Sequence, residues 1–413
     1  MNNKIKSLLC AIMLFACATV SAQNISGTWT GLLDAGMQKL HIVFNINKDK
    51  DGKDVCSMDS PDQSAKGIPA KLEYISADSI SIKVEAAAIN YNGKLEGDSI
   101  RGTFMQMGFS IPLNLKKEKI VYNRPQNPVK PYPYETEDVK FFNNPADAIL
   151  RGTLTYPVGY RKGDKVPVVL MVTGSGPENR DEELFEHRPF LVIADYLARN
   201  GIASLRYDDR GVGGSTAKGF TKNTKEVTDD ARCGINYLRS MKRFSKVGLL
   251  GHSEGGSVAF ILGAEDALDF AVSMAGPGVN GVELLYSQSK IITELSGQPF
   301  PMTKEKYIEY IRNMKNPWMD YFLDYDPTQD IKNTTCPVLA INGDKDRQVI
   351  ASLNLEAIKN NLPNNRNTVT KLYPGLNHLF QKCETGLPTE YTGIEQTISE
   401  EVLKDIAGWI NSL

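Results

Sequence analysis

The sequence predicts an α/β protein: a doubly wound, mostly parallel sheet with a helical cap, preceded by a small all-β barrel or sandwich domain. Three observations lead to this prediction. From about residue 136 onward, strand-like runs alternate with helix-like runs, which is typical of a parallel sheet covered on both faces. Residues 24–120 instead show period-two alternation and almost no helical periodicity. A helix-rich stretch at about residues 277–335 interrupts the later alternation.

The first 22 residues have the features of an export signal. A short basic stretch precedes an apolar run from Leu8 to Val20, which is too short to span a bilayer. Small residues then form a signal-peptidase site, so we expect residues 1–22 to be removed and Gln23 to begin the mature chain. A lipoprotein cleavage box ending at Cys17 ranks behind ordinary cleavage, because a bulky phenylalanine interrupts it. We therefore expect a periplasmic or extracellular protein without stable membrane insertion.

Residues 24–120 predict a β-rich accessory domain. In LHIVFNI (40–46) and SISIKVE (79–85), apolar and polar residues alternate, as they do in half-buried strands. GTWTG (27–31) resembles the Gly-x-Trp start of lipocalin-like barrels. Residues 121–135 follow with four prolines, which hold a chain extended, so we expect a semi-rigid linker.

Residues 136–413 predict the catalytic domain. VPVVLMV is apolar throughout, as expected of a strand buried on both faces. Further strands are predicted in ILRGTLTYP, IASLRY, KVGLL, FAVSMA, CPVLAING and NTVTKLY, with helices between most of them. The stretch at about 277–335 lies between two of these strands at their carboxyl edge, so it is placed to cap a site there.

Composition excludes several classes of protein. The 413 residues carry a formal net charge of −2, which argues against a nucleic-acid partner. Outside the signal, the cysteines show no paired spacing and no clustering with histidine, so we expect no metal site and no specified disulfide. We expect no cofactor and a small-molecule substrate, and the oligomeric state stays open.

The motif GHSEGG places Ser253 between a buried strand and a helix. A sharp strand-to-helix turn needs glycine on either side of the serine, and Gly251 and Gly255 provide it. Such a turn presents the serine hydroxyl at the edge of the sheet. We therefore predict Ser253 as a nucleophile.

A serine nucleophile needs a base and an acid. In this kind of fold the order along the chain is serine, acid, histidine, and His378 is the only histidine after Ser253. The acid should follow the strand CPVLAING, where Asp344 and Asp346 are both available. Its role is to fix the tautomer of the histidine and to stabilise the imidazolium.

An oxyanion hole needs two backbone donors. One is the N–H of Glu254, directly after the nucleophile. The other should come from the glycine-rich loop after VPVVLMV, where the N–H of Ser175 is the candidate.

From about residue 136 the chain resembles the α/β-hydrolase superfamily, in particular its secreted esterase and prolyl-oligopeptidase-like branch. The resemblance rests on TGSGPENRDE, RYDDRGVGGS, GHSEGG, NGDKDRQV and PGLNHLF, which occur in this order. It implies Ser253 as nucleophile, Asp346 as acid and His378 as base, with Ser175 and Glu254 at the oxyanion hole. The first domain resembles the β-barrel domain of some secreted bacterial esterases.

Three functions remain open at this stage. Hydrolysis of a carboxylic ester through an acyl-enzyme is the leading interpretation. A serine exopeptidase is the alternative, with Glu182 and Glu183 holding the amino terminus of a peptide. A ligand-binding protein with a relic hydrolase domain ranks third, because every residue type of the triad is present in order.

Overall fold

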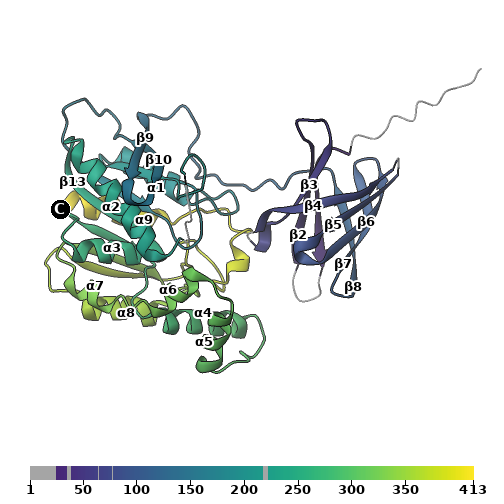
Figure 1. Ribbon diagram of the computed structural model, residues 1–413. Coiled ribbons are helices and arrows are strands. Elements are labelled where there is room, and N and C mark those ends of the chain that lie inside the picture. Colours follow the sequence, from purple (N-terminus) through teal and green to yellow (C-terminus); the bar gives the residue numbers. More distant parts are fainter. Residues whose placement is uncertain (1–24, 35–38, 64, 77, 217–221) are drawn as a thin grey trace, which may run out of the picture. The chain divides into compact units, whose positions relative to one another are not determined.

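The computed structural model describes residues 25–34, 39–63, 65–76, 78–216 and 222–413 (Figure 1). The predicted signal peptide lies outside these residues. The chain forms two compact units, the first ending at Val121 and the second beginning at Tyr122. Each unit has its own core and is described by itself.

The first unit is a closed antiparallel barrel in which each strand pairs with the next along the chain (Figure 1). β1 closes the barrel by pairing with β8 at Thr30 and Lys116. The strands are β1 (Gly27–Asp34), β2 (Lys39–Lys48), β3 (Asp54–Ser60), β4 (Ala65–Ile75), β5 (Ser79–Val84), β6 (Ile89–Glu96), β7 (Ser99–Gln106) and β8 (Phe109–Lys116). The prediction of a barrel or sandwich is thereby confirmed as a barrel.

Large side chains fill the interior of the barrel. Trp29, Phe44 and Tyr91 are fully buried there. The indole N–H of Trp29 donates to the carbonyl of Ile25 at 2.7 Å, and the Tyr91 hydroxyl donates to the carbonyl of Leu113 at 3.1 Å. Their polar atoms are therefore satisfied inside an otherwise apolar core, as buried aromatic residues require.

The second unit is built on an eight-stranded sheet in the order β16-β15-β14-β13-β11-β12-β10-β9. The strands from β11 to β16 run parallel, whereas β10 pairs antiparallel with both β9 and β12. Their bounds are β9 (Thr136–Asn143), β10 (Ala148–Thr155), β11 (Val166–Val172), β12 (Ala203–Tyr207), β13 (Phe244–His252), β14 (Ala271–Met274), β15 (Val338–Gly343) and β16 (Val369–Tyr373). The predicted doubly wound α/β fold is confirmed.

Helices cover both faces of this sheet. The helices are α1 (Pro189–Arg199), α2 (Thr224–Ser240), α3 (Glu254–Ala264), α4 (Gly281–Leu295), α5 (Lys304–Asn313), α6 (Pro317–Asp324), α7 (Thr328–Asn333), α8 (Ala351–Asn361) and α9 (Glu400–Ser412). Residues of α2, α3, α7 and α8 share one core, and residues of α1 and α9 share the other. Leu170 of β11 packs into the first core, and its neighbour Met171 packs into the second. Burial on both faces explains why β11 is apolar throughout.

Between β14 and β15 the chain forms the helices α4 to α7, of which α4, α5 and α6 gather at one edge of the unit (Figure 1). A separate apolar cluster holds these helices together and includes Leu284, Tyr307 and Phe322. Tyr307 and Phe322 are buried in this cluster, so they are core residues, whereas Tyr310 is half exposed. This part of the chain corresponds to the predicted cap.

The proline-rich stretch predicted as a linker is held on the second unit. The guanidinium of Arg124 is buried and donates to the carbonyls of Phe185, Thr392 and Ile394 at 2.8–3.0 Å. Gln126 accepts the N–H of Ile398 at 3.0 Å. The residues from Tyr122 onward are therefore part of the second unit and do not form a free tether.

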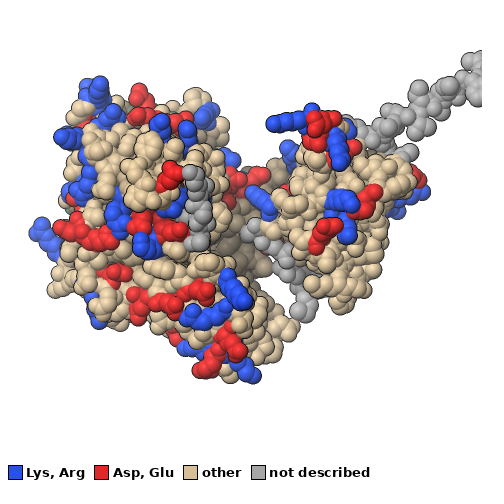
Figure 2. Space-filling view, in the orientation of Figure 1, with Lys and Arg blue, Asp and Glu red and all other residues tan. Residues whose placement is uncertain are grey.

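The surface of the described chain has mixed charge. Figure 2 shows Lys and Arg interspersed with Asp and Glu over the visible face of each unit. Within the described ranges, no helix is both long and apolar enough to cross a membrane, and no cluster of His, Cys, Asp and Glu is arranged to hold a metal ion. Four cysteines, Cys56, Cys233, Cys336 and Cys383, are free thiols.

Candidate active site

Ser253 lies at the turn that joins β13 to α3. Its backbone has φ 53° and ψ −120°, a combination that a residue with a side chain rarely adopts. Its N–H donates to the carbonyl of Met274 on the adjacent strand β14 at 2.9 Å. The sheet therefore holds a strained serine at the carboxyl end of its central strands, as the sequence predicted for a nucleophile turn.

The glycines around Ser253 are required by close packing. A Cβ on Gly251 would lie 1.9 Å from the carbonyl oxygen of Gly255, and a Cβ on Gly255 would lie 2.3 Å from that of Val172. Both distances are too short for any side chain. The glycines thus allow the turn to pack tightly against β11.

His378 and Asp346 form a buried pair. His378 Nδ1 lies 2.8 Å from Asp346 Oδ2, and both side chains are almost fully excluded from solvent. The other carboxylate oxygen of Asp346 accepts the N–H groups of Gln348 and Val349, each at 2.8 Å. Asp344 is exposed, and its carboxylate accepts the N–H of Gly375 at 2.6 Å. The structure therefore brings Asp346, and not Asp344, to the predicted base.

The loop after β11 lies against the serine turn. A Cβ on Gly174 would lie 3.3 Å from the Cβ of Ser253. Ser175 is exposed, and its hydroxyl donates to Glu254 Oε2 at 2.7 Å. The two residues predicted to supply oxyanion donors are therefore neighbours beside Ser253.

The Glu254 side chain is a buried junction that the sequence analysis missed. Besides Ser175, it accepts the hydroxyl of Thr224 at 2.7 Å and the indole N–H of Trp318 at 2.9 Å. Burial raises the pKa of this carboxyl, and the hydrogen bonds from Thr224, Ser175 and Trp318 oppose the rise. Thr224 begins α2 and Trp318 belongs to α6, so one carboxylate links the cap to the serine turn.

Glu182 and Glu183, which would hold a peptide amino terminus under the exopeptidase alternative, already have partners. Glu182 is buried, and its Oε1 accepts the N–H of Gly174 at 3.0 Å and lies 2.9 Å from Nδ1 of His252. Glu183 pairs with Arg188 at 3.0 Å. Sequence spacing gave no sign of the contact between Glu182 and His252, because 70 residues separate the two.

Ion pairs hold the glycine-rich loop 208–215. Asp209 pairs with Lys222 at 2.7 Å, and Arg210 pairs with Asp230 at 2.6 Å. The hydroxyl of Thr173 also donates to Asp209 at 3.2 Å. The loop therefore supports the neighbouring loop after β11.

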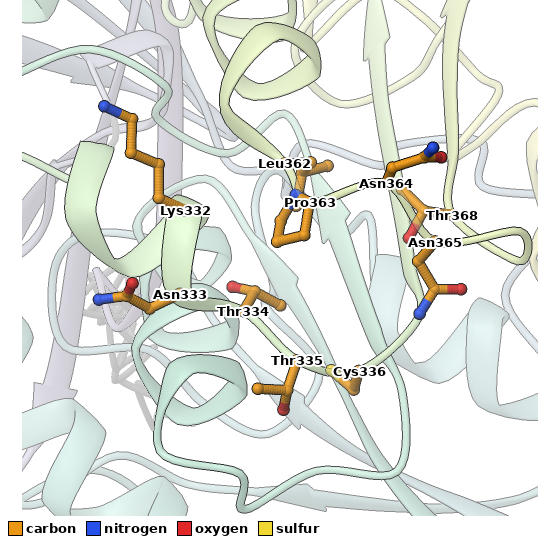
Figure 3. A pocket seen from close by; sticks show the side chains of 10 residues that line it. All are labelled: Lys332, Asn333, Thr334, Thr335, Cys336, Leu362, Pro363, Asn364, Asn365 and Thr368. Carbon is orange, nitrogen blue, oxygen red and sulfur yellow. The ribbon is translucent and has the colours of Figure 1, made fainter.

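One pocket of about 340 Å³ lies away from this site. Figure 3 shows its lining residues, which come from α7, the segment after α7 and the segment after α8. In its wall, Thr368 directly precedes β16 and Cys336 lies two residues before β15. The pocket is thus at the amino ends of these strands, whereas Asp346 follows the carboxyl end of β15, so the pocket is separate from the candidate site.

Several known proteins are similar to this chain, and the family match lies within the second unit. Residues 188–335 match the family model described as serine aminopeptidase, S33. Esterase EstD of Thermotoga maritima is 28% identical over 294 residues, which cover 68% of this chain and 69% of the relative. Among solved structures, the esterase Pf2001 of Pyrococcus furiosus has a TM-score of 0.47 at 17% identity and covers 71% of this chain and 99% of its own. Est1E of Butyrivibrio proteoclasticus with bound ferulic acid has a TM-score of 0.46 at 16% identity, over 66% of this chain and 96% of its own.

The sheet order, the parallel strands and the serine turn after β13 define the class of α/β-hydrolases. The family model and the sequence relative agree with this class. The second unit therefore has the α/β-hydrolase fold, and an eight-stranded barrel precedes it along the chain.

Proposed function

We propose that the protein is an exported serine esterase that cleaves carboxylic esters through an acyl-enzyme, with Ser253, His378 and Asp346 as its triad. The observation that supports this most directly is the buried pair of His378 and Asp346 at 2.8 Å, on the same edge of the sheet as the strained turn of Ser253. A carboxylate on Nδ1 holds the proton there and leaves Nε2 of the histidine to act as a base.

In the first half-reaction, the Oγ of Ser253 attacks the ester carbonyl carbon while Nε2 of His378 takes the hydroxyl proton. The backbone N–H groups of Ser175 and Glu254 stabilise the oxyanion that forms. The tetrahedral intermediate then collapses, the C–O bond to the alcohol breaks, and His378 returns its proton to the alcohol. Water repeats the sequence on the acyl-enzyme and releases the acid.

We favour esters over peptides because the acidic side chains that could bind a peptide amino terminus are engaged. Glu182 is buried against His252, and Glu183 pairs with Arg188. The name of the matching family, serine aminopeptidase, keeps exopeptidase activity as the second candidate. EstD, the sequence relative, is named an esterase.

The test is labelling and kinetics on the purified protein. A fluorophosphonate probe should label the wild type and leave Ser253→Ala unlabelled, and equal labelling would rule out Ser253 as the nucleophile. Short-chain nitrophenyl esters should give a far higher kcat/KM than alanyl or alanyl-prolyl anilides. Efficient anilide cleavage would favour the exopeptidase. Tight binding of a hydrophobic ligand without labelling would favour the binding protein.

Export is the remaining part of the proposal. It is supported by the basic, apolar and small-residue segments of residues 1–22. Protein recovered from the periplasm or the medium of a bacterial host should begin at Gln23. An intact Met1 on the mature protein would contradict export by this signal.

A further inference from the structure

The buried pair of Glu182 and His252 joins the segments that carry the proposed catalytic groups. Glu182 has φ 53°, a backbone conformation that is uncommon for a residue with a side chain. Its carboxylate is buried. One oxygen of this carboxylate meets both the N–H of Gly174, at 3.0 Å, and Nδ1 of His252, at 2.9 Å. Gly174 directly precedes Ser175 in the loop after β11.

His252 continues the connection to the loop of the proposed base. Its Nε2 lies 3.0 Å from the backbone carbonyl oxygen of His378, and the two imidazole rings are 4.8 Å apart between centroids. His252 also directly precedes Ser253. A single carboxylate and a single imidazole therefore link the oxyanion loop, the serine turn and the loop of His378.

The hydrogen-bond partners of His252 favour its charged form. An ionised carboxylate and a backbone carbonyl are both acceptors, so both ring nitrogens donate to them, as only the imidazolium can. The electrostatics agree with this geometry. Burial lowers the pKa of His252, but the charge and hydrogen bond of Glu182 outweigh burial and bring the pKa to about 9.

The groups around the pair are also titratable and largely buried. Glu178 faces both Glu182 and His252, and burial followed by the charge of Glu182 raises the pKa of its carboxyl. Lys222 donates to the carbonyl of Gly174 at 3.0 Å and pairs with Asp209 at 2.7 Å. The backbone of Gly174 is thus held at its N–H by a carboxylate and at its carbonyl by an ammonium group.

We propose that Glu182 and His252 are positioning residues that fix the oxyanion loop and the His378 loop around Ser253, an inference that rests on the proposed esterase function. Neither residue donates a proton to substrate. They act through Gly174 and His378, and the link requires His252 to carry its second proton.

The first arm of the test is kinetic. Glu182→Gln keeps the size of the side chain but removes the charge that holds His252 protonated. Misplacement by about 1 Å can cost roughly 100-fold in rate, so we expect a loss of that order in kcat on a nitrophenyl ester, with KM nearly unchanged. The matched control is Glu186→Gln, an exposed position in the same segment, which should retain wild-type kcat. A kcat for Glu182→Gln within about twofold of wild type, when the variant is folded by circular dichroism, would overturn the proposal.

The second arm follows the protonation of His252 by NMR, which needs no activity, and adds the pH profile of kcat. The chain has four histidines, so ¹⁵N NMR of the imidazoles can resolve His252, with His252→Asn for assignment. A pKa raised to about 9 means that the link is intact at lower pH and is lost as pH rises through 9. We expect an imidazolium at pH 7.5 in the wild type and a wild-type kcat that falls near pH 9, with the fall moved to lower pH in Glu182→Gln. A neutral His252 at pH 7.5 would overturn the proposal even if Glu182→Gln does not fold.

A wild type that neither cleaves esters nor binds the fluorophosphonate probe would instead overturn the esterase function. The NMR result would still decide whether His252 is charged and linked to Glu182.

Discussion

Asp344 and Asp346 follow the same strand but occupy opposite environments. Asp346 is fully buried between His378 and two backbone N–H groups, whereas Asp344 is exposed in a turn. Asp346→Asn should lower kcat by several orders of magnitude, because an amide no longer fixes the histidine tautomer. Asp344→Asn should change kcat little. Steady-state kinetics of the two folded variants checks this, and a larger loss in Asp344→Asn would reverse the assignment.

Burial of His187 makes the free energy of unfolding depend on pH. It is buried near Thr397 and Tyr391, and burial, followed by the charge of Arg124, lowers its pKa from 6.5 to about 4. Between these two pH values, His187 is neutral in the folded state and protonated in the unfolded state. The contribution of His187 to the free energy of unfolding is fully present above pH 6.5. It decreases by roughly 3 kcal/mol as the pH falls to 4.

Urea unfolding at pH 7 and at pH 4 measures this effect. Carboxylates also contribute to the acid loss, so the comparison is with His187→Gln, which should lose less free energy of unfolding over the same interval than the wild type does. Equal losses in the two proteins would show that His187 does not contribute.

Chain order and local spacing were enough to predict Ser253, Asp346, His378, Ser175 and Glu254 as candidates. The sequence favoured Asp346 over Asp344 only through the resemblance to α/β-hydrolases. In the structure, Asp346 is the carboxylate that is buried against His378. The partner of His252 could not be predicted, because a contact between residues 182 and 252 leaves no periodicity in the sequence. The assigned roles stay predictions until the variants are measured.

Among the helices, α6 has a polar connection to the serine turn. Trp318→Phe keeps an aromatic ring beside Phe322 but removes the N–H that Glu254 accepts. A hydrogen bond to a charged group contributes about 1.5–3 kcal/mol, so α6 should open more often. We expect faster amide exchange in α6 and a lower kcat/KM.

The matched control is Trp409→Phe, which removes an indole bond to the carbonyl of Asn367 in another part of the unit. This control should leave the exchange of α6 unchanged. If both variants accelerate exchange in α6 equally, the effect is global destabilisation and the link through Glu254 is not responsible.

Most elements were predictable because their periodicity is strong, but element ends depended on caps. The run from Lys304 to Tyr325 reads as helix-like throughout, yet α5 ends at Asn313 and α6 begins at Pro317. The side chain of Asn316 accepts the N–H groups of Trp318 and Met319, and proline suits the first helical position. The sequence did not predict that Arg124 fastens the proline-rich stretch to the second unit, because the burial of a single arginine leaves no periodic pattern.

At the scale of the whole molecule, the second unit should work without the barrel. We expect a fragment of residues 122–413 to fold and to retain activity on small soluble esters. A fragment of residues 136–413 lacks Arg124, whose guanidinium donates to three backbone carbonyls that are distant in sequence. Each hydrogen bond from a charged group contributes about 1.5–3 kcal/mol, and rearrangement of the shorter chain would recover part of the loss. It should therefore unfold at a clearly lower temperature.

Thermal unfolding of the two fragments checks this, with Arg124→Met in the full chain as a point control. Equal melting temperatures would show that the stretch before residue 136 adds no stability. A folded but inactive 122–413 fragment would mean that the barrel contributes to catalysis.

The four free thiols have a consequence for oxidation chemistry. Burial raises the pKa of Cys56 and Cys336 to about 12, and it also raises those of Cys233 and Cys383. Oxidants and disulfides react with the thiolate, which is therefore scarce at these four positions while the protein is folded. The folded protein should thus tolerate an oxidising compartment and a reducing one alike, and its thiols become vulnerable only during the interval in which the chain is still unfolded.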